Sequence, residues 1–163
     1  MTTHRPNIIL ILLDQLRADA TGYVNPAIRT PNIDRLASEG VTFRRCYTNA
    51  PLCVPARTSL ITGQHVNEHA VWSNSIVPDR HGPSHVRNIR DTGYHTVVIG
   101  KTHLCEYARD IHTDSLLPAL RDWGYAESLE TGGALTPVYF NSPYTDYLAE
   151  KGLLAIHLSL IHI

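Results

Sequence analysis

Blocks of continuous aliphatic residues alternate with segments of helical periodicity along this chain. The clearest blocks are residues 7–13 and 95–100, which are rich in β-branched residues and are followed by polar side chains. Continuous apolar runs of this length, bounded in this way, are typical of strands buried within a parallel sheet. Residues 41–43 predict a further extended segment.

Proline or serine at one end, and glycine at the other, delimit several of the predicted helices. Helices are expected at residues 33–39, at 55–61, from the Ser84 cap to Gly93, at 114–123 with an interruption at Pro118, and at 144–151. Strands that alternate with helices indicate an α/β fold class, with a mainly parallel sheet flanked by helices.

Composition narrows the possible functions. The chain has 163 residues, 43% of them hydrophobic, which is enough for one core and one domain. The formal net charge is −1 and no basic run offers a stripe for phosphates, so no nucleic-acid partner is expected. The apolar run at residues 8–13 is too short to span a membrane and precedes no cleavage site. We therefore expect a cytoplasmic protein without a membrane partner, or one whose export signal has been lost.

The candidate chemistry lies where these elements end. Asp14 ends the first predicted strand, Lys101 and His103 follow the second, and Cys53 precedes a helix. In open α/β sheets, sites gather beyond the carboxyl ends of strands. Arg57 is four residues after Cys53, so one helical turn places both side chains on the same face. With the positive end of the helix dipole, the pair predicts a cradle for a tetrahedral oxyanion. The alternative is a structural cysteine buried before a helix.

The sequence from Cys53 to Gly63 resembles the signature of the sulfatase family, Cys-x-Pro-x-Arg followed by Thr-Gly. Residues 5–15, 30–37 and 100–103 are similar to the family in order and spacing, and the similarity covers roughly residues 5–152. The resemblance implies an alkaline-phosphatase-like α/β fold and a hydrolase of sulfate esters.

In that family the motif cysteine is oxidised to formylglycine, whose aldehyde hydrates to a geminal diol. One hydroxyl attacks sulfur, and the other lets the intermediate expel sulfate while the aldehyde is regenerated. By resemblance, Cys53 is this residue, both nucleophile and metal ligand, and it requires a formylglycine-generating enzyme as a maturation partner. Arg57 matches the residue that holds the diol, Lys101 bridges diol and substrate, and His103 helps the diol collapse. Lys101 and His103, if they extend the preceding strand, point to one face.

The resemblance also implies a divalent cation, with calcium as the expected ion. Asp14 matches one of its ligands, and Gln15 stands where many members have a second aspartate. A carbonyl oxygen can still coordinate, but the site loses one negative charge, so the identity of the metal is left open.

Histidine and cysteine offer other interpretations. His65 to His69 spell H-x-x-E-H, a pattern of some zinc peptidases. A helix there is disfavoured, because Gly63 has just ended one and Asn67 is a poor helix former. His69 instead resembles a histidine in a loop beside the sulfatase site, a possible substrate loop. Four other histidines are expected to be structural or on the surface: His81, His85, His95 and His112. Cys46 and Cys105 are expected to be small buried hydrophobes.

Sulfatases run to several hundred residues, so residues 1–156 are interpreted as the N-terminal part of a sulfatase catalytic domain. Residues 157–163 are interpreted as a truncated or non-native tail, with a genuine strand as the alternative. By the family pattern, further metal ligands, a histidine and a second lysine lie downstream, so the chain alone is expected to be inactive. The expected substrate is a small-molecule or carbohydrate sulfate ester. A phosphonate or phosphate ester hydrolase of the same superfamily, or a catalytically silent fragment, is the alternative.

Overall fold

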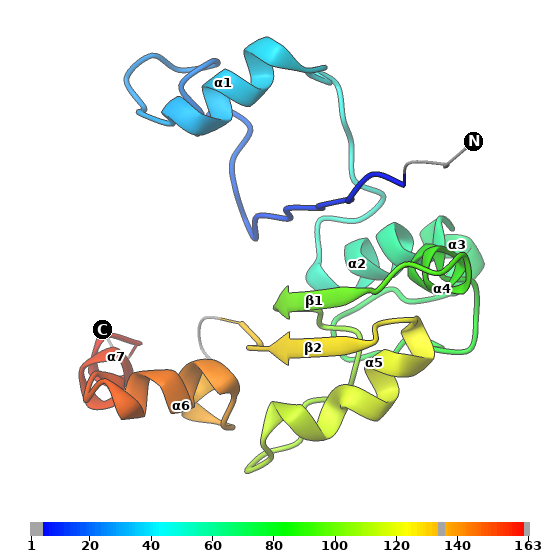
Figure 1. Cartoon of the computed structure of the whole chain (residues 1–163), viewed down its shortest axis with the longest axis vertical. Coiled ribbons are helices and arrows are strands. Elements are labelled where there is room, and N and C mark those ends of the chain that lie inside the picture. The colour runs from blue at the N-terminus through cyan, green and yellow to red at the C-terminus, as the bar shows by residue number, and fades with distance from the viewer. Residues whose placement is uncertain (1–4, 134–135, 162–163) are drawn as a thin grey trace. The chain divides into compact units, whose positions relative to one another are not determined.

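The computed structural model describes residues 5–133 and 136–161 (Figure 1). The chain divides into two compact units, residues 1–46 and residues 47–163. No described helix is long and apolar enough to cross a membrane.

The N-terminal unit contains helix α1 (Pro31–Glu39), which confirms the helix predicted at 33–39. Asp34 holds the preceding loop in place, because its Oδ1 accepts hydrogen bonds from the Thr30 hydroxyl at 2.8 Å and from the Tyr23 amide at 3.0 Å. The Thr30 hydroxyl oxygen in turn accepts from the Gly22 amide at 2.7 Å. No α1 residue is buried, so polar contacts rather than a core define this unit.

The strand predicted at residues 7–13 is not formed. Residues 5–13 have no regular secondary structure, and the six aliphatic side chains from Ile8 to Leu13 are each at least 50% exposed. The extended segment predicted at 41–43 is likewise no strand, and its Val41 and Phe43 are exposed. A parallel strand is stable only beside a hydrogen-bonded neighbour with both faces covered, and the described part of this unit supplies neither. The apolar pattern of these two segments is therefore not enough to predict a strand.

The second unit contains a parallel pair of strands, β1 (Val97–Gly100) and β2 (Glu127–Glu130) (Figure 1). They are linked through the 3-10 helix η1 (Thr113–Leu116) and helix α5 (Leu117–Trp123), so the interruption predicted at Pro118 is the junction of two helices. β1 confirms the strand predicted near residues 95–100, but not its burial, since Val97 is 46% and Ile99 74% exposed.

Helices on this sheet supply the core. Helix α2 (Cys53–Thr62) contacts α3 (Val66–His69) and α4 (His85–Asp91), and α4 contacts α5. The core consists of side chains from these helices and the loop after β1: Ile61, Val86, Leu104, Leu120 and Trp123. Leu120 and Trp123 are fully buried, and a side chain of this size contributes about 2–3 kcal/mol when buried. The fold is therefore an α/β domain with a parallel sheet flanked by helices.

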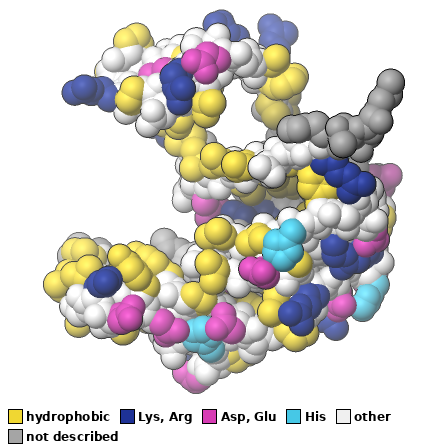
Figure 2. Space-filling model, in the orientation of Figure 1, with side chains coloured by type: hydrophobic (Ala, Val, Ile, Leu, Met, Phe, Trp, Pro, Cys, Tyr) yellow, Lys and Arg dark blue, Asp and Glu magenta, His cyan; other side chains and the backbone are white. Residues whose placement is uncertain are grey.

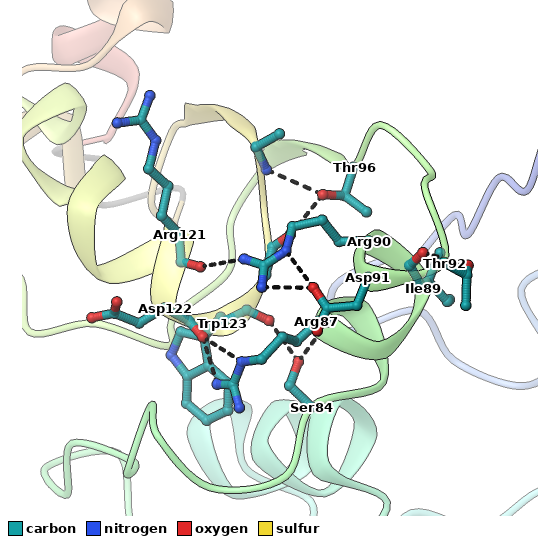
Figure 3. Close-up of polar contacts among 12 residues, drawn as sticks. Ser84, Arg87, Ile89, Arg90, Asp91, Thr92, Thr96, Arg121, Asp122 and Trp123 are labelled. Carbon is teal, nitrogen blue, oxygen red and sulfur yellow. Dashed lines mark hydrogen bonds and ion pairs between the residues drawn. The ribbon is translucent and has the colours of Figure 1, made fainter.

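A polar network joins α4 to the end of α5 (Figure 3). Ser84 caps α4 as predicted, accepting from the Arg87 amide, and its hydroxyl donates to the Trp123 carbonyl at 2.6 Å. The Arg87 guanidinium donates to the Asp122 carbonyl, and that of Arg90 to the Arg121 carbonyl. The carbonyls of Asp122 and Trp123 lie at the end of α5, where no further turn can satisfy them, so α4 supplies donors to both. The Arg121 carbonyl also accepts from the Gly124 amide at 3.0 Å.

The C-terminal part holds the short 3-10 helix η2 (Thr136–Val138) and two helices, α6 (Pro143–Glu150) and α7 (Leu154–Ile161). α6 confirms the predicted helix, with Ser142 as its cap. α7 shows that the described residues after 153 are helical rather than a strand, whereas residues 162–163 lie outside the described range. Figure 2 shows hydrophobic side chains gathered on these helices, and the exposed ones include Tyr144, Tyr147, Leu153, Ile156 and Leu160.

Candidate active site around Cys53

Cys53 is the first residue of α2 and is half-buried. The preceding Leu52 provides no side-chain cap, and the Val54 amide instead donates to the Asn74 side-chain carbonyl at 2.9 Å. Gly63, at φ 72°, ends the helix in the left-handed conformation, as the sequence predicts. The sulfur of Cys53 therefore stands at the positive end of a ten-residue helix.

Lys101 and Arg57 meet at this helix end. The Lys101 Nζ donates a hydrogen bond to the Cys53 Sγ at 3.5 Å, although the two residues are 48 positions apart. The Arg57 guanidinium donates to the backbone carbonyl of Lys101. Gly133 flanks the lysine, since a Cβ at that position would lie 3.4 Å from Nζ. The structure thus brings together three of the residues singled out from the sequence: a sulfur, an ammonium and a guanidinium.

His103 lies close to this group in the sequence but in a different local geometry from the one predicted. β1 ends at Gly100, and His103 has φ 55°, so the strand does not continue through Lys101 and His103. The condition on which a common face of the two side chains was predicted is therefore not met, because the alternation of a strand is lost. The His103 ring packs on Tyr107 with centroids 5.6 Å apart.

A pocket of about 290 Å³ opens beside His103 and Val54, the residue that follows Cys53. Its lining combines polar and apolar side chains: Val54, Asn74, Ser75, Ile76, Val77, Pro78, His103, Cys105, Glu106 and Tyr107. A ligand with both polar groups and an apolar face fits such a lining.

The hydrogen bonds of His69 link α3 to α2 and do not involve Cys53. Its Nδ1 accepts from the Val71 amide at 3.1 Å, and its Nε2 lies 2.9 Å from the Ser59 hydroxyl. Burial lowers the pKa of His69, which favours the neutral ring. With Nδ1 accepting, the proton of the neutral ring is on Nε2, so His69 donates to Ser59 and cannot act as its general base.

The H-x-x-E-H sequence does not form a zinc-binding helix. A short helix does form there, so the expectation that Gly63 and Asn67 disfavour one is wrong. α3 is only four residues long, however, and Glu68 is used within it, accepting from the His65 amide at 2.7 Å as part of a capping box. No group of three or more histidine, cysteine, aspartate or glutamate side chains suited to a metal ion occurs among residues 5–133 and 136–161.

Asp14 and Gln15 form a turn in the N-terminal unit, where Gln15 has φ 57°. Their side chains offer three oxygen atoms, whereas calcium takes about six to eight. The donors are of the right kind for a hard cation, but the described residues do not supply enough of them for a complete calcium site.

Three residues at this site have no sequence signal that marks them. Asn74 contacts the start of α2, and the buried Glu130 with Tyr107 contacts the segment around Lys101. Glu130 belongs to β2, a strand that the sequence analysis missed because only one of its four residues is aliphatic. Their contacts are between residues far apart in sequence, which no local pattern reveals.

The other cysteines differ from one another. Cys46 is exposed, so its expected burial is wrong, since the N-terminal unit has no core around it. Cys105 is partly buried against the main core, and burial raises its pKa to about 12.

Comparison with known proteins places this arrangement in a family. The sulfatase family model matches residues 6–153. The chain is 40% identical over 101 residues to the sulfatase YidJ of Escherichia coli (strain K12), covering 61% of this chain and 20% of that protein. It is 38% identical over 102 residues to an arylsulfatase of Clostridium perfringens (strain 13 / Type A), covering 61% and 21%.

A solved structure also matches, that of a protein in complex with its substrate D-glucosamine-2-N,6-O-disulfate. The TM-score is 0.61 and the identity 32%, covering 64% of this chain and 21% of that one. The chain therefore spans about a fifth of the length of the relatives it matches. The family model covers most of the chain, and the chain belongs to the sulfatase family.

Proposed function

We propose that this chain is part of a sulfuric ester hydrolase in which Cys53 is the residue oxidised to formylglycine. The observation that carries the proposal is the 3.5 Å contact between the Lys101 Nζ and the Cys53 Sγ at the N-terminus of α2. Family membership and the sulfatase names of the relatives support sulfate ester hydrolysis in general.

The side chains around position 53 suit an oxyanion. The α2 N-terminus and the Lys101 ammonium both favour negative charge at the end of this side chain. The hydrated formylglycine supplies a nucleophilic oxygen and returns to the aldehyde when sulfate leaves. Lys101 donates a hydrogen bond to that oxygen and stabilises the charge that develops there. Arg57 holds the Lys101 backbone by donating to its carbonyl, which keeps the ammonium in place.

His103 borders the pocket beside Val54 and is proposed as the group that takes up a proton when the diol collapses. The pocket receives the alcohol part of the ester. A carbohydrate or another small sulfate ester suits its mixed polar and apolar lining, in line with the disulfated glucosamine held by the matching structure.

A divalent cation, calcium by resemblance, is proposed to bind Asp14, Gln15 and the residue at position 53. When bound, such an ion polarises the sulfate oxygens and favours the ionised nucleophile. The described residues alone hold too few ligands for a complete calcium site.

A chimaera tests the proposal. Residues 6–153 replace the matching segment of the Clostridium perfringens arylsulfatase, and the product is made together with a formylglycine-generating enzyme. We expect the chimaera to hydrolyse an aryl sulfate. Lys101→Ala should lower kcat by roughly 10²–10⁴-fold, because a positioned charge contributes that much.

Lys151→Ala is the matched control. It removes the only other lysine, whose Nζ lies 5.7 Å from the Tyr147 ring, and it should leave kcat unchanged. An active chimaera in which both variants retain full kcat would show that the oxyanion site is wrongly placed.

A further inference from the structure

A buried carboxylate lies under the segment that carries Lys101 and His103. Glu130, the last residue of β2, is 1% exposed. The Thr102 amide donates to both of its carboxylate oxygens, at 3.0 Å each, and the Gly132 amide donates to Oε1 at 3.2 Å. Both partners are backbone N–H donors, and the carboxylate accepts through both of its oxygens. A single side chain thus holds the backbone between Lys101 and His103.

Tyr107 extends this contact to His103. Its hydroxyl donates to the Glu130 Oε1 at 2.7 Å and accepts from the His103 amide at 3.1 Å. The Tyr107 ring stacks on Phe140, with centroids 5.1 Å apart and planes 6° apart. Burial and the neighbouring Glu130 raise the pKa of Tyr107, so the hydroxyl keeps its proton and stays a donor.

These hydrogen bonds hold residues 101–103, a segment that belongs to no helix or strand. β1 has ended at Gly100, and His103 has φ 55°, a conformation that costs free energy for a residue with a side chain. The backbone amides of Thr102 and His103 both donate to this pair of side chains. The side chains of Glu130, in β2, and of Tyr107, in the loop after β1, therefore replace the sheet hydrogen bonds.

We infer that Glu130 is a positioning residue, which with Tyr107 holds the segment 101–103 against the N-terminus of α2 and so sets Lys101 beside Cys53. Neither residue touches the sulfur. They act through the backbone of Thr102 and His103, while Arg57 holds the Lys101 carbonyl from α2. The importance of Glu130 and Tyr107 for catalysis rests on the proposed function, whereas their effect on the position of Lys101 beside Cys53 can be measured without turnover.

Alkylation of Cys53 in the unmodified 163-residue chain tests the inference, with iodoacetate and iodoacetamide compared by peptide mass spectrometry. The two reagents differ in charge, so the ratio of the iodoacetate rate to the iodoacetamide rate reports on the ammonium 3.5 Å from the sulfur. Lys101→Met should lower this ratio about threefold to tenfold, because the ammonium attracts the anionic reagent. Tyr107→Phe and Glu130→Gln should lower the ratio by at least half as much on a logarithmic scale.

The ratio separates positioning of Lys101 from general loosening of the fold. A merely structural defect exposes Cys53 to both reagents alike and leaves the ratio unchanged, whereas displacement of Lys101 lowers it. In the Lys101→Met background, Tyr107→Phe should have no further effect on the ratio. Tyr125→Phe is the matched control, a partly buried tyrosine packed on the core, and it should leave the ratio unchanged.

Tyr107→Phe keeps the ring stacked on Phe140, so it decides the question if Glu130→Gln unfolds the chain. An unchanged or higher ratio of the iodoacetate rate to the iodoacetamide rate in Tyr107→Phe would overturn the inference, and so would a lowering of the ratio by Tyr107→Phe that persists without Lys101. Because the assay needs neither formylglycine nor sulfate ester turnover, its failure would leave the proposed function standing.

Discussion

Gly124 ends α5 with φ 113°, at the point where α5 meets α4. A Cβ built there would lie 2.4 Å from the Arg87 nitrogen and 2.5 Å from its Cα, which are backbone atoms that cannot swing aside. Gly124→Ala must therefore strain its own backbone and also push α4 away. The Arg87 guanidinium, which donates to the Asp122 carbonyl at 3.0 Å, would be displaced with it.

Gly100 allows the two costs to be separated. It has φ 104°, close to the φ of Gly124, but apart from its chain neighbours no described atom lies within 4 Å of a Cβ at that position. Gly100→Ala should lower the free energy of unfolding by about 1–2 kcal/mol, the cost of the left-handed region. Gly124→Ala adds about 1–3 kcal/mol of overpacking, for a total of about 2–5 kcal/mol.

Urea denaturation provides the measurement. In a Trp72→Phe background, which removes the exposed tryptophan, the fluorescence of the buried Trp123 reports on the α4–α5 contact, and circular dichroism reports on the helices. Coincident transitions by the two probes would justify a two-state analysis. Equal losses of stability in Gly100→Ala and Gly124→Ala would refute the reasoning, because the close approach to Arg87 would then cost nothing.

Two further predictions concern stability. Ser84→Ala should lower the free energy of unfolding by about 1–3 kcal/mol in the same urea assay, because it removes the α4 cap and the donor to the buried Trp123 carbonyl. The exposed Ser115→Ala is its control and should stay within about 0.5 kcal/mol, so equal effects would contradict the assignment. The pKa of Cys105 rises from 9.0 to about 12 on folding, so its stabilising contribution is complete below pH 9 and is lost as pH rises to about 12. Stability should fall between pH 8 and pH 10 by less in Cys105→Ala than in the parent chain, and an identical fall would contradict this prediction.

Local chemistry decided which parts of the fold could be predicted. The Ser84 cap and Gly63 act within one or two turns, so the helix start and the helix end that they mark were predicted correctly. Pro118, predicted as an interruption of one helix, instead lies in the first turn of α5. Strands depend on partners distant in the sequence. The aliphatic run at 7–13 is no strand, whereas the mostly polar residues of β2 form one because they pair with β1.

The same distinction applies to the site. The four-residue spacing of Cys53 and Arg57 follows from helix geometry and could be predicted from α2 alone. The resemblance supplied the expected pairing of Lys101 with position 53, and the structure shows those side chains in contact. Glu130 and Tyr107 could not be foreseen, since Glu130 accepts from the Thr102 amide 28 positions away and Tyr107 donates to Glu130, 23 positions away.

Labelling of the chain with a hydrazide tests the central claim most directly, since the claim is that Cys53 becomes an aldehyde. The chain is produced aerobically together with a formylglycine-generating enzyme, treated with the probe and digested. We predict that the peptide containing Cys53 is labelled and that those containing Cys46 and Cys105 are not. Arg57→Ala, which breaks the Cys-x-Pro-x-Arg sequence, should abolish the label. Absence of label at Cys53, while a sulfatase produced in the same cells is labelled, would contradict the account.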